Sequence, residues 1–254
     1  HKGRGLGNQF LDNLREADVI IQVVDASGST DAEGNPVDPG TRDPLEDVTF
    51  LRYEFAMWMA GIVDKHLAKL VRQAQGKEAV LIDLLGGALA GLRINAIQIR
   101  EAVIETGINL AKATPEDIEK MCEVLLRVSK PMIIAANKAD QASDANLAAL
   151  KELGAVPTIA AGELALKSAA QAKILRYLPG DGTFVPVEGA KLSAPQLKAL
   201  TMIAENMKKF GGTGVQDALN NLVFEEIGMI AVYPVEDDNK CCNAKGVVLP
   251  DAFL

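Results

Sequence analysis

The chain has 254 residues, of which 48% are hydrophobic and 24% charged, and its formal net charge is −8. This size and apolar content suffice for one large domain, or for roughly two to three small ones with a real core. The negative charge argues against broad nonspecific binding of nucleic acid, although a local basic face can exist on an acidic protein. No run of about 18 apolar residues occurs, so the sequence predicts no membrane-spanning helix.

The cysteines and histidines point to no metal site and no hydrolase triad. Cys122, Cys241 and Cys242 match no zinc spacing and cannot all pair in disulfides, so a reduced, cytoplasmic setting is expected. His1 and His66 have no convincing nucleophile near them in the sequence.

The first residues are rich in glycine. Gly3, Gly5 and Gly7 precede a helix-like run at 10–17, and this segment is either a flexible turn or a switch-type loop. It is not the GxxxxGK[ST] loop that holds a phosphate. Because the chain opens without Met or a signal-peptide pattern, we interpret it as an internal fragment or a partial gene product.

A first strand is predicted at 19–24, where nearly all residues are apolar. Its polar exit begins at Asp25, which is either a functional carboxylate at the end of a strand or only the first capping residue of the loop that follows. Residues 28–44, rich in Gly, Pro, Asp and Thr, indicate a surface loop.

Residues 45–128 show helical periodicity instead. Helices are predicted along 51–70, at 80–92, at 96–105 and at 115–128, the last one capped by Thr114. A crossover between parallel strands needs only about a dozen residues, so this stretch is interpreted as an inserted helical subdomain. One face of its first helix carries Lys65, Lys69 and Arg72. This face is either a contact surface for RNA or the ribosome, or an ordinary solvated face.

The stretch Lys130–Asp140, KPMIIAANKAD, carries the most specific chemistry. The apolar run 132–136 predicts a buried parallel strand that delivers Asn-Lys-Ala-Asp at its carboxyl end, where ligands bind in open α/β sheets. The Asp140 carboxylate can accept two hydrogen bonds from the adjacent N–H and NH2 of guanine, which adenine does not offer. The alternative is an accidental turn.

Two neighbours of Asp140 have predicted roles. Asn137 can tie adjacent loops together, and the stem of Lys138 can lie on a purine with its ammonium in water.

The next segments continue an alternating pattern. A helix is predicted at 142–153, a strand at 155–160 and a helix at 164–172, and backbone N–H groups at the strand exit, around Thr158, Ile159 and Ala160, can meet a base oxygen. Further on come turn chemistry at 177–184, helices at 195–210 and 215–221, and a β-rich segment beginning near residue 222.

The order of these segments resembles a known family. RGLGNQFLDNLREAD, VVDASGSTD, KPMIIAANKAD, PGDGTF, GTGVQDALN and VYPVED together look like the archaeal and eukaryotic branch of the Obg-related GTPases, close to the YchF type. The resemblance implies an α/β fold with a P-loop GTPase-type sheet, an inserted helical subdomain and the start of a β-grasp TGS domain. It implies a partial GTPase domain at 1–45 and 128–221, an insertion at 46–127 and a truncated TGS domain at 222–254. GTP or GDP, with Mg²⁺ in the full-length parent, and an association with ribosomes or translation are implied as well.

The resemblance also implies site residues. Asn137, Lys138 and Asp140 match the guanine-recognition motif, and Thr158, Ile159 and Ala160 lie in the loop that meets the base from the other side, with Ile159 where the family usually has Ser. Asp at 140, rather than Glu, argues for guanine over adenine. No P-loop is present, and the resemblance aligns His1–Gly7 with the segment just after the family's Asp-x-x-Gly switch, which places that switch upstream of His1. These residues alone are therefore expected not to hydrolyse GTP, whereas the parent is expected to. The alternative is a non-catalytic RNA- or ribosome-binding module on a GTPase-derived scaffold.

Overall fold

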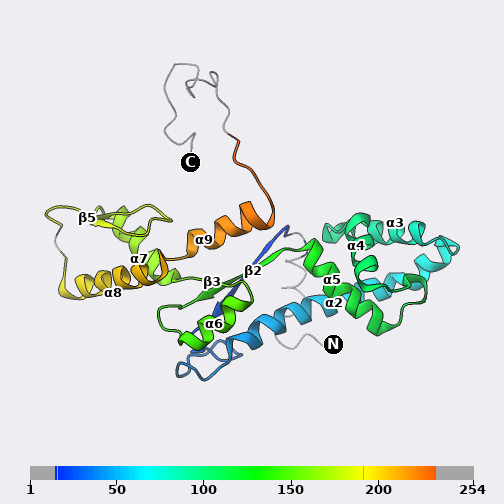
Figure 1. Cartoon of the computed structure of the whole chain (residues 1–254), viewed down its shortest axis with the longest axis horizontal. Coiled ribbons are helices and arrows are strands. Elements are labelled where there is room, and N and C mark those ends of the chain that lie inside the picture. Colours follow the sequence, from blue (N-terminus) through cyan, green and yellow to red (C-terminus); the bar gives the residue numbers. More distant parts are fainter. Residues whose placement is uncertain (1–14, 16, 191, 233–254) are drawn as a thin grey trace, which may run out of the picture.

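A computed structural model describes residues 15, 17–190 and 192–232. The described chain has three neighbouring parts, with a small parallel sheet in the middle, a helical bundle at one end, and a unit of two helices and a short hairpin at the other (Figure 1). The predicted α/β class is therefore confirmed.

The central sheet has the order β1-β2-β3, and both strand pairs are parallel. Its strands are β1 (Ile20–Asp25), β2 (Met132–Asn137) and β3 (Val156–Pro157). The register pairs Ile20 with Met132 and Asp25 with Asn137, so β1 and β2 start and end together. Their carboxyl ends therefore deliver polar residues to one edge of the sheet.

The predicted insertion is a bundle of four α-helices, with two short 3-10 turns between them. They are α2 (Pro44–Ala74), α3 (Glu78–Leu89), η1 (Ala90–Leu92), α4 (Ala96–Thr106), η2 (Leu110–Lys112) and α5 (Pro115–Ser129). The 31-residue helix α2 starts where the Asp43 side chain accepts a hydrogen bond from the backbone N–H of Leu45 and Pro44 takes a first-turn position.

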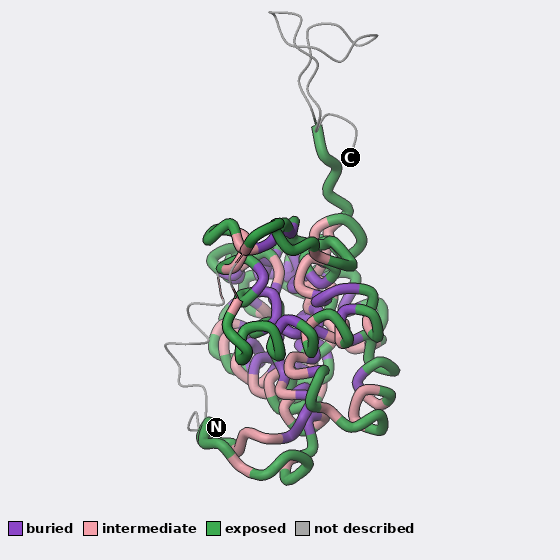
Figure 2. Tube along the Cα trace, turned by 90° about the vertical axis from the view of Figure 1, so that its left-hand side faces the viewer, coloured by how far each residue is buried: buried purple, intermediate pink, exposed green. Residues whose placement is uncertain are grey.

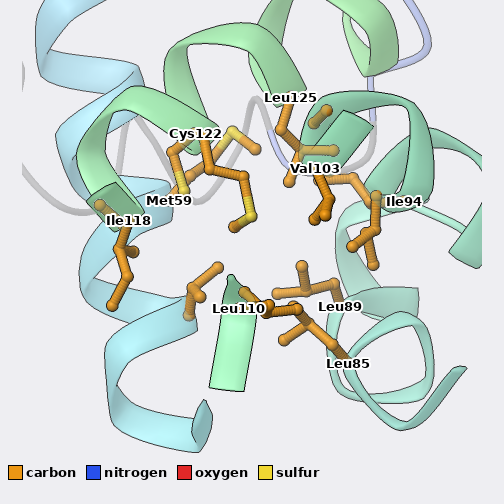
Figure 3. Packing of buried hydrophobic residues seen from close by; sticks show 14 of the residues in the cluster. Met59, Leu85, Leu89, Ile94, Val103, Leu110, Ile118, Cys122 and Leu125 are labelled. Carbon is orange, nitrogen blue, oxygen red and sulfur yellow. The ribbon is translucent and has the colours of Figure 1, made fainter. Parts of the chain in front are cut away.

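The bundle and the sheet share one core. Buried apolar side chains from all four helices pack together, among them Met59, Leu85, Val103 and Leu125 (Figure 3). Ile20 of β1 belongs to the same cluster, so the amino ends of the strands are packed against the bundle. Figure 2 shows that the buried stretches of the described chain lie in the interior and the exposed ones around them.

The remaining elements follow β2 in the chain. They are α6 (Asp144–Glu152), α7 (Ala160–Gln171), β4 (Leu175–Arg176), β5 (Val185–Pro186), α8 (Ala194–Phe210), α9 (Val215–Asn220) and the π-helical turn η3 (Asn221–Glu226). Two boundaries differ from expectation, since β3 is only two residues long and α7 begins at Ala160, four residues early. The antiparallel pair β4 and β5 was not predicted.

The β-rich segment expected to begin near residue 222 is not found at residues 222–232, the part of it that the structure describes. Residues 221–226 form η3 and pack on the sheet through Leu222, and residues 227–232 form no strand. The strands expected further on fall at 233–254, outside the described residues, as does the helix expected at 10–17 except for its residues 15 and 17. The division into GTPase, insertion and TGS domains remains a prediction.

Among the described helices, none is by itself long and apolar enough to cross a membrane. The stretch Glu78–Leu92 reaches that length and composition only together with Ala96–Thr106, from which it is bent by 116°.

Candidate functional site

The candidate site lies where β1 and β2 end side by side. Asp25 is the register partner of Asn137, and the backbone N–H of Ala26 donates to the Asn137 carbonyl at 2.9 Å, which extends the pairing by one residue. The two loops that leave this edge carry the residues singled out in the sequence.

Asn137 joins the β2 loop to the loop before α7. Its side-chain oxygen accepts a hydrogen bond from the N–H of Ala160 at 3.1 Å. The backbone reinforces this connection, since Thr158 donates to the Ala136 carbonyl at 2.9 Å and Ala139 donates to the Thr158 carbonyl at 3.2 Å. The predicted role of Asn137 in tying adjacent loops together is confirmed.

The same bond explains why α7 starts early. Ile159 provides no side-chain cap, and the amide oxygen of Asn137 takes that place from another loop. A sequence pattern could not reveal this cap, because the capping residue lies 23 positions upstream.

The N–H groups expected to meet a base oxygen are used within the protein. Thr158 and Ala160 donate as described above, and Ile159 donates to the Thr213 carbonyl at 2.8 Å. These three N–H groups are therefore not free to donate to a base oxygen, contrary to what was expected of them. Within the described residues, the N–H groups of Ala161 and Gly162, in the first turn of α7, make no hydrogen bond; Ala161 is exposed, whereas Gly162 is buried.

Lys138 lies between the two strand ends. Its backbone is left-handed, with φ at 57°, a conformation that costs energy for a residue other than glycine. Its Nζ contacts Asp25 Oδ2 at 2.7 Å, Ser29 Oγ at 3.0 Å and Thr30 Oγ1 at 3.1 Å. The ammonium is therefore paired, not kept in water as predicted, while about a third of the side chain stays exposed.

The Asp25 carboxylate is the acceptor for a whole group of donors. Besides Lys138, it accepts from the backbone N–H and hydroxyl of Ser27 and from the hydroxyls of Ser29 and Thr30. Burial alone would raise the pKa of Asp25, but the hydrogen bonds from Lys138 and the three hydroxyls outweigh it and hold the pKa well below its usual range. Asp25 thus both caps its own loop and pairs with the site lysine.

Gly28 lets the following loop fold back over this group. Its φ is +62°, and an added Cβ would lie 2.2 Å from the carbonyl oxygen of Arg42. Only glycine fits this close approach, which returns the loop to its start through hydrogen bonds from Gly40 to Ser27 and from Arg42 to Gly28. The sequence shows a glycine at position 28, but it could not show that the Arg42 carbonyl lies against it.

Asp140 is the exposed member of the motif. Its side chain makes no hydrogen bond or ion pair with any residue in the described part of the chain, although Ala139 beside it is buried. A charged acceptor is thus presented at the rim of the sheet, next to the loop that Asn137 holds.

The other predicted side chains lie elsewhere. Lys65, Lys69 and Arg72 are exposed on the second half of α2, in the bundle and not at the carboxyl edge of the sheet. Over the described ranges, no three His, Cys, Asp or Glu side chains gather in a way that would hold a metal ion.

The sequence and the structure of this chain are similar to those of proteins named as GTP-binding. A family model described as Obg-like GTPase YGR210-like, G4 motif-containing domain, matches residues 135–237, which include the Asn137–Asp140 loop. An uncharacterized GTP-binding protein of Methanocaldococcus jannaschii is 45% identical over all of this chain and 65% of its own length. The crystal structure of a GTP-binding protein from Pyrococcus horikoshii OT3 superimposes with a TM-score of 0.71 at 36% identity, covering 90% of this chain and 63% of the other.

The chain is similar to the Obg/YchF-like GTPases. A protein named ribosome-binding ATPase YchF, from Mycoplasma pneumoniae, is 31% identical over 54% of this chain and 34% of its own length. The chain spans slightly less than two thirds of the M. jannaschii and P. horikoshii relatives.

Asp25 gives this edge of the sheet a predicted dependence on pH. A carboxylate whose pKa is lowered by folding stabilises the protein above its unfolded pKa, near 4, and that contribution is lost as the pH falls further. We expect Asp25→Asn to unfold at lower urea concentration at pH 7 and to lose less additional stability between about pH 5 and pH 2.

Urea unfolding followed by circular dichroism at several pH values measures this. Asp38→Asn is the matched control, because Asp38 is exposed and its carboxylate has no partner within the described residues. Equal acid sensitivity in Asp25→Asn and the unchanged protein would contradict the role given to the Asp25 group.

Proposed function

We propose that this chain supplies the base-binding part of a guanine-nucleotide site in a GTPase. The observation that carries the proposal is Asp140, an exposed and unpartnered carboxylate at the carboxyl edge of a parallel sheet. The GTP-binding names of the M. jannaschii and P. horikoshii relatives support it.

The chemistry of the choice of base is set by hydrogen bonding. Guanine offers two adjacent donors, an N–H and an NH2, to the two oxygens of a carboxylate, and such charge-assisted pairs are among the stronger hydrogen bonds. Adenine presents a ring-nitrogen lone pair at that place and would leave the carboxylate without its partners.

Lys138 would support the base from its flat side. With its Nζ held by Asp25, the aliphatic stem is fixed at the strand end and provides an apolar surface against which a purine can lie. Asn137 keeps the loop before α7 close, and the unpaired N–H group of the exposed Ala161 is the donor best placed for a base oxygen or another acceptor.

The activity of the whole protein is part of the same proposal. We infer that the parent hydrolyses GTP with Mg²⁺ held at the phosphates, by analogy with the family. The ribosome-binding name of the M. pneumoniae relative supports a cytoplasmic role with the ribosome, to which the bundle and a following TGS domain would respond.

Replacing Asp140 tests the choice of base. Asp140→Ala should weaken binding of GDP by about tenfold or more and remove its preference over ADP, because the charge-assisted pair is lost. Asp140→Asn offers one acceptor and one donor, which matches the xanthine edge with its N–H and C=O, so the preference should move from GDP to XDP. Ligand-observed NMR titrations at up to about millimolar nucleotide, a range suited to weak binding, measure both changes.

Asp144→Asn is the control for the loss of an acidic side chain next to this loop, since Asp144 is exposed at the start of α6 and makes only a 3.4 Å ion pair with Lys209. Equal affinity of the unchanged protein for GDP and ADP would contradict the proposal. So would a guanine preference that survives Asp140→Ala.

The second candidate function, an RNA- or ribosome-binding module, rests on the exposed Lys65, Lys69 and Arg72. Changing all three to Glu should weaken cosedimentation with ribosomes and lower its salt dependence, while the guanine preference stays unchanged. The charge-matched control changes Lys151, Lys167 and Lys198, which are also exposed, to Glu. If both triple variants cosediment equally well, this face of α2 does not bind the ribosome.

A further inference from the structure

A buried carboxylate lies directly behind the loop that precedes α7. Glu163, in the first turn of α7, is 7% exposed, and its Oε2 accepts hydrogen bonds from the Tyr177 hydroxyl and the Thr213 hydroxyl, both at 2.6 Å. Burial, with the hydrogen bond to Glu163 as the next cause, raises the pKa of Tyr177 to about 12, so its proton stays in place to be donated. Three segments far apart in the sequence are thereby joined at one oxygen.

The same Thr213 also holds the loop through its backbone. Its carbonyl accepts the N–H of Ile159 at 2.8 Å. Gly214 beside it has φ at +73°, and an added Cβ would lie 1.8 Å from the carbonyl oxygen of Pro157. No other residue fits there without displacing the loop.

A second glycine-rich loop supports the first. An added Cβ at Gly182 would lie 2.9 Å from the Gly211 carbonyl oxygen, and one at Gly180 would lie 3.1 Å from Gln216 Cγ. The segment PGDG therefore packs against GGTG, and GGTG in turn packs against residues 157–159. Neither PGDG nor GGTG takes part in the proposed contacts with the base.

We propose that Glu163, Thr213 and Gly214 form a brace that positions residues 157–162 for guanine recognition. Asn137 and β2 hold this loop from one side, and the brace holds it from the other. Together they fix where the unpaired N–H groups of Ala161 and Gly162 lie relative to the Asp140 loop. The inference rests on the proposed function, and its residues are positioning residues that do not touch the nucleotide.

Thr213→Val tests the brace, because valine keeps the branched shape and the backbone carbonyl but cannot donate to Glu163. We expect faster hydrogen exchange of the Ile159 amide and GDP binding about three- to tenfold weaker, the size of effect expected for the loss of one ordinary hydrogen bond. The control is Thr201→Val, whose exposed hydroxyl donates only to the Leu197 carbonyl within α8. It should change neither quantity. Tyr177→Phe removes the second donor and should act in the same direction as Thr213→Val.

A double-mutant cycle with Asp140→Ala separates positioning from a general loss of stability. If the brace aligns the loop for the same base that Asp140 reads, Thr213→Val should cost less in the Asp140→Ala background than alone. Additive effects, or normal GDP affinity and normal exchange at Ile159 in Thr213→Val, would overturn the brace. Absence of a guanine preference in the unchanged protein would instead refute the proposed function, while the exchange of the Ile159 amide would still report on the brace.

Discussion

The parallel pairing of β1 with β2 is the constraint on which the rest depends. Their six-residue register ends with Asp25 opposite Asn137, so the next residue of β2, Lys138, is brought to the Asp25 carboxylate from 113 positions away. The bundle of α2 to α5 lies between these strands in the sequence and packs on their other ends through Ile20. The four-helix bundle is thereby accommodated without disturbing the edge where the polar residues meet.

At that edge the charged side chains play different parts. Lys138 and Asp25 neutralise each other in a half-buried group of hydroxyls, which is the arrangement that an ion pair removed from water requires. Asp140 is left exposed and without a partner among the described residues, so its charge remains available for a ligand. In the proposed account this contrast distinguishes the residues that shape the site from the residue that reads the base.

Much of this arrangement could be predicted from the sequence, because the apolar runs that end in Asp25 and in Asn137 are typical of buried parallel strands. The helical periodicity of residues 45–128 likewise predicted the bundle. The cap that Asn137 places on α7 could not be predicted, since it joins residues in separate elements. The partner of the Lys138 ammonium was missed for the same reason, and so was the buried Glu163, whose acidic side chain suggests a surface position until Tyr177 and Thr213 are seen to surround it.

Helix α8 and the turn into α9 are joined to the candidate site through the Gly211–Gly214 loop. The N–H of Ile159 donates to the Thr213 carbonyl, so a displacement of the Gly211–Gly214 loop would also displace the loop before α7.

The central claim is that this edge of the sheet binds a guanine base through Asp140. Amide chemical-shift mapping of the 15N-labelled chain during titration with GDP and, separately, ADP tests it most directly. The account predicts that GDP shifts the amides of residues 138–141 and 161–162 and that ADP leaves them nearly unchanged. Equal shifts with both nucleotides, or shifts centred on another surface such as the second half of α2, would contradict it.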